Sequence, residues 1–154
     1  MKLATLAEGD AEAIRAEIVS QLRGRDGGGE AVFRGRSAAL IGAIAPALVW
    51  LRDEKNVTLT TEVVRFSLEL RCIWKLAIEK IVLLRDRDTG AVTEIDVSDD
   101  IPDAVTWPLR SYLGEVPGYH PGMPLEGQAG SAASTQHFFV LMYLPLTLIW
   151  PIVR

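Results

Sequence analysis

One long apolar segment constrains the fold of this chain more than any other feature. From Phe33 to Asp53 the sequence has two arginines near its start, then an uncharged stretch rich in leucine, isoleucine, alanine and glycine, and then Arg52. Leucine and isoleucine recur at the spacing of a helical face, and the small residues between them allow other helices to approach closely. We therefore predict a central helix over residues 30–54, kinked at Pro46 because proline removes a backbone hydrogen bond.

Capping residues and glycines delimit further helices. Asp10 is a suitable N-cap for a first helix, which Gly24 and the glycines at 27–29 end. Thr60 or Thr61 is a suitable N-cap for a short helix after the central one. From these signals we predict helices over 11–23, over 60–68, from 70 onward, over 98–115 with Pro102 near its first turn, and from Ser134 or Thr135 onward, with a loop over 116–134.

Residues 81–97 follow a different pattern. Two β-prone arms flank Asp88-Thr89-Gly90, which is typical of a β-hairpin. A chain of 154 residues with 49% hydrophobic and 23% charged residues has the size and composition of one folded domain. The predicted fold is therefore mainly α, a compact bundle of about five to seven helices over 1–154 with a small β-hairpin near 81–97.

The residue types that carry catalysis and metal binding are scarce. The two histidines, His120 and His137, are not joined by any motif, and the single cysteine, Cys72, is distant from both in sequence. Cys72 lies in an apolar-periodic segment, which predicts a buried thiol and a reducing, cytoplasmic setting. The glycines at 27–29 lack the lysine and hydroxyl residue that end a phosphate-binding loop. We therefore predict no catalytic residues, no metal site and no cofactor.

The C-terminal segment over 138–153 is uncharged and strongly apolar. It is shorter than the roughly 20 residues that a membrane-spanning helix needs, and two prolines interrupt it. We expect a buried or oligomer-facing helix here. The alternative is a small membrane-associated helical protein anchored by this segment.

The charged residues suggest two candidate binding surfaces. The net charge is −4 and most of the acidic excess lies after residue 90, so a DNA-binding face would have to be a local patch in the first part of the chain. The first candidate surface, for DNA or protein cargo, consists of Arg34, Arg36, Arg65, Arg71 and Lys75. The second lies in the acidic region 94–103, would bind a basic protein partner, and consists of Asp96, Asp99, Asp100 and Asp103.

Several short motifs, taken in order, resemble a known family. They are Phe33-Arg-Gly-Arg36, Leu48-Val-Trp-Leu-Arg-Asp53, Thr61-Glu-Val-Val-Arg-Phe66, Pro108-Leu-Arg-Ser-Tyr-Leu113 followed by Pro117-Gly-Tyr119, and Gln136-His137-Phe138. Their order and spacing over residues 5–143 resemble the all-helical substrate-recognition domain of type IV secretion coupling ATPases, especially the Dot/Icm-like and related conjugation branch. The hairpin at 81–97 and the end of the chain over 144–154 depart from that pattern.

The resemblance implies a location and a role. The domain would be part of a larger hexameric, membrane-anchored motor, and would lie at its cytoplasmic entrance at the inner-membrane secretion apparatus, in contact with the motor domain and not spanning the membrane itself. It would dock DNA, a relaxosome protein or a secreted effector protein without catalysing a reaction. A protein-binding adaptor that uses the acidic region 94–103 and does not contact DNA is the alternative.

Overall fold

A computed structural model describes residues 2–24, 27–129 and 132–149, and it confirms a mainly α fold with a small β-hairpin. The elements, in chain order, are α1 (Leu3–Glu8), α2 (Ala11–Ser20), α3 (Gly29–Lys55), α4 (Thr61–Ser67), α5 (Leu70–Trp74), the π-helical turn η1 (Lys75–Glu79), β1 (Ile81–Arg85), β2 (Val92–Asp96), α6 (Asp103–Glu115), α7 (Leu125–Ala129), α8 (Ala132–Leu141) and α9 (Leu146–Ile149).

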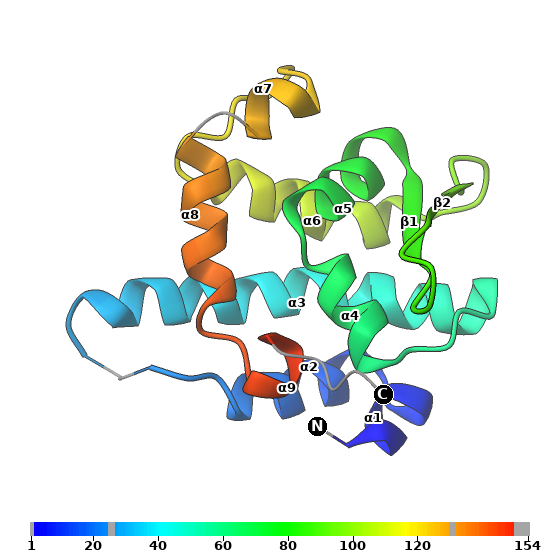
Figure 1. Cartoon of the computed structure of the whole chain (residues 1–154), viewed down its shortest axis with the longest axis horizontal. Helices are drawn as coiled ribbons and strands as arrows, with labels where there is room; N and C mark the ends of the chain where they lie inside the picture. The colour runs from blue at the N-terminus through cyan, green and yellow to red at the C-terminus, as the bar shows by residue number, and fades with distance from the viewer. Residues whose placement is uncertain (1, 25–26, 130–131, 150–154) are drawn as a thin grey trace.

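Helix α3 is the centre of the bundle, as predicted. It lies across the molecule with α1, α2 and α9 on one side and α5 to α8 on the other, while α4 overlaps it in this view (Figure 1). Its side chains Leu40, Ile41 and Leu48 have no exposed surface, because α2, α6 and α8 pack against it. Helix α3 continues through Pro46 without a break and ends at Lys55; the residue after it, Asn56, has a left-handed backbone conformation. By length and composition α3 could also cross a membrane, but a buried core helix meets the same criteria.

Two predicted caps are confirmed. The Asp10 carboxylate accepts a hydrogen bond from the Ala13 amide at 2.8 Å and begins α2. The Thr60 hydroxyl accepts one from the Val63 amide at 3.1 Å and begins α4. Each satisfies one of the backbone donors that the first turn of a helix leaves unpaired.

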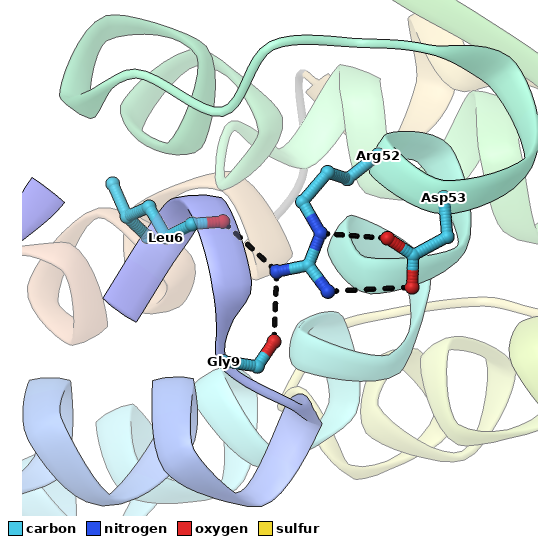
Figure 2. Close-up of polar contacts among 4 residues, drawn as sticks. All are labelled: Leu6, Gly9, Arg52 and Asp53. Carbon is cyan, nitrogen blue, oxygen red and sulfur yellow. Dashed lines mark hydrogen bonds and ion pairs between the residues drawn. The ribbon is translucent and has the colours of Figure 1, made fainter. Parts of the chain in front are cut away.

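Helix α1 was not predicted, and it is held by a contact from α3. Arg52 Nη1 donates to the carbonyl oxygens of Leu6 at 2.9 Å and Gly9 at 2.7 Å, while Nε and Nη2 donate to the Asp53 carboxylate (Figure 2). A six-residue helix is not stable alone, so its order depends on such tertiary contacts. The fully buried side chain of Leu6 supplies the apolar part of that contact.

The hairpin follows directly from a π-helical turn. The η1 turn ends at Lys80 in the left-handed conformation, and β1 then pairs antiparallel with β2, from Ile81 opposite Asp96 to Arg85 opposite Val92. One carboxylate oxygen of Asp86 accepts from the backbone amides of Asp88 and Thr89, which closes the turn. The predicted hairpin over 81–97 is therefore confirmed.

Three predicted boundaries were wrong. The helix predicted from Ser98 begins at Asp103, because residues 98–100 form a turn in which Asp100 and Ile101 donate to the Val97 carbonyl. The loop predicted over 116–134 contains α7, and α8 begins at Ala132. The apolar segment predicted as one helix over 138–153 is broken after Leu141, and α9 follows Pro145; residues 150–153 lie outside the described chain.

Candidate docking surface on helix α8

The surface of α8 and α9 exposes large apolar side chains. Residues 132–149 contain no charged side chain. The exposed fractions are 57% for Phe138, 44% for Phe139, 42% for Met142 and 55% for Leu146. We call these four residues the α8 face. Clusters of exposed apolar side chains on one surface commonly mark interaction sites, whereas isolated ones do not.

A groove lies beside the α8 face, between α5, α7 and α8. Its volume is about 470 Å³, which falls within the usual range for sites that bind sizeable ligands. Its apolar walls come from all three helices, and two carboxylates and one guanidinium lie along it. The lining side chains include Leu70, Leu125, Phe138, Leu141, Glu69, Arg71 and Glu126.

His137 fixes the wall of the groove to the core. Its Nε2 donates to the Leu68 carbonyl oxygen at 2.7 Å, so Nδ1 is the acceptor for the Tyr112 hydroxyl at 2.9 Å. This bond pattern connects α8 to α6 and to the end of α4. Burial lowers the pKa of His137, so the neutral ring that this pattern requires is favoured. The wall of the groove is therefore fixed at a junction of three elements, α4, α6 and α8.

A second anchor joins α8 to α3. The Ser37 hydroxyl, fully buried, lies 2.6 Å from the Val140 carbonyl oxygen and 3.0 Å from the Phe33 carbonyl oxygen. The Phe33 ring packs near Phe139 at 5.6 Å between centroids. The α8 face is therefore presented by a helix that is held on both sides.

Two arginines beside α8 on the α3 side use neutral acceptors. Arg36 Nη1 donates to the Gln136 side-chain oxygen at 3.0 Å, and its guanidinium lies 5.2 Å from the centre of the Phe33 ring. Arg23 Nη2 donates to the Met142 carbonyl oxygen at 2.7 Å. Neither forms an ion pair with a carboxylate of the described chain. Arg36 also lines a separate small pocket with Glu115 and Gln136.

The arginines on the groove side share one carboxylate. Arg71 lies 3.4 Å and Arg65 4.0 Å from Glu69. Arg71 and Arg85 both lie over the Phe66 ring, at 5.0 and 4.7 Å from its centre. Among the residues that line the groove, Arg71 is accompanied by the carboxylates of Glu69 and Glu126.

The structure divides the predicted basic surface. Arg34 and Arg36 lie on the first turns of α3, and Arg65 and Arg71 lie on α4 and α5 across α8 from them. Lys75 follows Arg71 by one helical turn; it lies 2.8 Å from Glu79 and 3.6 Å from Glu94 of the hairpin, and the Glu79 carboxylate raises its pKa. The five residues therefore come from two regions, the start of α3 and the segment from α4 to η1.

The predicted acidic surface is largely engaged in local contacts. Asp100 pairs with Lys55, and Asp103 pairs with Arg110 at 2.6 Å. Asp96 accepts from the hydroxyl and the amide of Ser98, and these bonds lower the pKa of Asp96. Asp99 is exposed. Across 2–24, 27–129 and 132–149, no group of three or more His, Cys, Asp or Glu residues is placed to hold a metal ion.

Sequence reasoning missed the α8 face. It predicted a buried or oligomer-facing helix from the apolar composition of the segment, whereas the structure leaves Phe138 and Phe139 exposed. A run of apolar residues does not by itself show which of them the neighbouring elements will cover.

Comparison with known proteins gives one informative relationship. No protein-family model matches the chain. The chain is 30% identical over 113 residues to the type 4 coupling protein DotL of Legionella pneumophila. The matched region is 73% of this chain and 13% of that protein, so the chain spans a small part of its relative's length. The similarity supports a relation to type IV coupling proteins.

Proposed function

We propose that this chain is a non-catalytic recognition module of a type IV coupling protein, and that it docks protein cargo on the α8 face. The cargo would be a relaxosome protein or a secreted effector protein. The module would lie at the cytoplasmic entrance of the secretion apparatus, next to the motor domain of a hexameric ATPase. The observation that carries the proposal is the α8 face itself, in a chain related to such a protein.

The composition of the surface supports protein binding. Interfaces between proteins are enriched in aromatic residues, methionine and arginine and depleted in acidic residues at their centres. Phe138, Phe139 and Met142 belong to the α8 face, and Arg71 lines the groove together with Phe138. A groove beside exposed aromatic residues also provides the pocket that an interface anchor needs.

The arrangement of charge favours protein over DNA. Binding to a duplex depends on several cationic side chains that contact successive phosphates, and loses affinity steeply with salt. Here Lys75, Arg65 and Arg71 have carboxylates within 4.0 Å, and Lys75 faces the hairpin instead of the α8 face. The adaptor hypothesis that uses region 94–103 has less support, because Asp96, Asp100 and Asp103 have local partners.

The test uses the purified chain with two kinds of ligand in parallel. Fluorescence anisotropy with labelled single- and double-stranded DNA at low and physiological salt should show little binding. Purified relaxase and effector proteins of the same secretion system should bind, and Phe138→Ser with Met142→Ser should weaken that binding. Val92→Ser changes an exposed apolar residue of the hairpin and is the matched control; it should leave the binding of these proteins unchanged.

The outcomes separate the possibilities. Salt-sensitive DNA binding that the double variant leaves unchanged would refute the proposal and restore DNA as the cargo. Protein binding that disappears in the Asp96, Asp99, Asp100 and Asp103 alanine variant, but not in the α8 variant, would favour the acidic adaptor surface.

A further inference from the structure

We propose that the loop between α6 and α8 is the specificity element of the docking site. The part of it over residues 120–129 contains α7, and we call this part the α7 loop. It forms one wall of the groove but is separable from the bundle, so it determines which apolar side chain of the cargo the groove accepts. This inference rests on the proposed function and adds the part of the site that selects the cargo.

The two ends of this segment meet at the start of α8. Gly118 has a φ of +87°, and a Cβ on it would lie 2.7 Å from the Cβ of Ala132, so a larger residue would not fit. With about 1.5 Å for each Cα–Cβ bond, the Cα atoms of these two residues are no more than about 6 Å apart. That separation is typical of a tight turn. Surface segments of this length with adjacent ends are Ω-loops, which are frequently functional.

The α7 loop contributes little to the hydrophobic core. Over residues 120–128, where side chains are described, the one buried side chain is the polar Gln128. Its side-chain oxygen accepts from the His120 amide at 3.2 Å, and its nitrogen donates to the carbonyl oxygens of His120 at 2.5 Å and Met123 at 3.4 Å. These bonds hold the loop in shape from within. Because burial of apolar surface is the main source of stability, the bundle should tolerate loss of the loop.

The α7 loop nevertheless forms part of the groove. Leu125 and Glu126 line the groove together with Leu70 of α5 and Phe138 of α8. Helix α7 packs against α5 and α8, and Figure 1 shows it beyond the end of α8 that points away from α3. The α8 wall is fixed to the core by His137, whereas the α7 wall can change while the others stay in place. Binding sites commonly combine a rigid scaffold with variable loops in this way.

The closeness of the ends defines a variant that lacks the loop. Replacing residues 120–131 with one glycine leaves Tyr119 and that glycine between Gly118 and Ala132, which is the length of a β-turn. Tyr119 is kept because it packs against the hydrophobic core. We call this variant the shortened chain, and we expect its melting temperature to stay within about 4 °C of that of the unmodified chain.

The experiment selects random 16-residue peptides displayed on phage against the immobilised unmodified chain and, separately, against the shortened chain. We expect the two selections to enrich different sequence patterns. Peptides from the unmodified chain, made synthetically, should bind the shortened chain about tenfold or more weakly and should lose affinity for Phe138→Ser as well. Gln128→Ala keeps the length of the loop but not its internal bonds, and should weaken the same peptides about threefold or more. Val92→Ser on the hairpin is the matched control and should bind them unchanged.

The other outcomes separate this inference from the proposed function. Peptides that depend on Phe138 but bind the unmodified and the shortened chain equally well would overturn the inference and leave the docking function intact. A shortened chain that does not fold would make the loop part of the bundle and would also overturn it. Peptides that bind without dependence on Phe138, or selections that enrich nothing on either chain, would count against the proposed function and this inference together.

Discussion

Replacing Arg52 with methionine should detach helix α1 from the bundle. The substitution keeps an unbranched apolar side chain and removes every hydrogen bond of the guanidinium. Two of those bonds end on the carbonyl oxygens of Leu6 and Gly9, at the C-terminal end of a helix of six residues. Arg52 itself is largely buried, with 14% of its side chain exposed, so water replaces these bonds only in part.

The expected loss follows from those two bonds. A hydrogen bond with a charged partner contributes about 1.5–3 kcal/mol, and the lower end applies because both carbonyls become partly hydrated after the substitution. We therefore expect Arg52→Met to reduce the free energy of unfolding by about 2–4 kcal/mol. The Asp53 contact should matter little, because that carboxylate is exposed to solvent.

Urea unfolding followed by circular dichroism measures the loss, and amide hydrogen exchange locates it. Asp53→Asn is the matched control, because it keeps the position and an acceptor oxygen while removing the ion pair. Exchange in α1 should accelerate in Arg52→Met before the rest of the fold is affected. The reasoning fails if Asp53→Asn is as destabilising as Arg52→Met, or if α1 keeps its protection when the guanidinium is gone.

Three further predictions follow from other contacts. Burial lowers the pKa of His137, so the unfolded chain binds its proton more readily, and stability should fall as pH drops below about 6.5; urea unfolding of His137→Gln should show a weaker pH dependence. Gly24→Ala should lower the melting temperature, because φ is +95° and a Cβ would lie 2.6 Å from the Tyr143 ring, whereas Gly35→Ala should raise it slightly. Burial raises the pKa of Cys72 to about 12, so a disulfide thiol reagent at pH 8 should label it only after unfolding.

Local signals in the sequence predicted the parts of the fold that depend on neighbouring residues. Asp10 and Thr60 cap helices by bonding three residues ahead, so their effect is visible in a short window. The apolar period of α3 and the Asp88-Thr89-Gly90 turn are also local. Helices α1, α7 and α9 are too short to show a helical repeat of apolar residues. They are stabilised by tertiary contacts with residues distant in the sequence, which a short stretch of sequence does not reveal.

The candidate site was less predictable because charge compensation is a property of the folded chain. Arg71 looked available in the sequence, and only the fold places it against Glu69 and the Phe66 ring. Lys75 was grouped with the arginines, yet the hairpin brings Glu94 to it from far along the chain. The apolar composition of 138–149 was evident, but the break after Leu141 and the burial of His137 decide which side chains form a surface.

The π-helical turn η1 determines the direction of the hairpin. A π turn contains about one residue more than an α turn, and each residue of an α-helix rotates the chain by about 100°. Removing one residue between Lys75 and Glu79 would therefore restore an α-helical register and swing β1 and β2 by about that angle around the helix axis. The hairpin's contacts with η1 and α4 would be lost, although every residue of the hairpin would be unchanged. Its placement on the bundle is thus encoded outside the hairpin, by the length of a single turn.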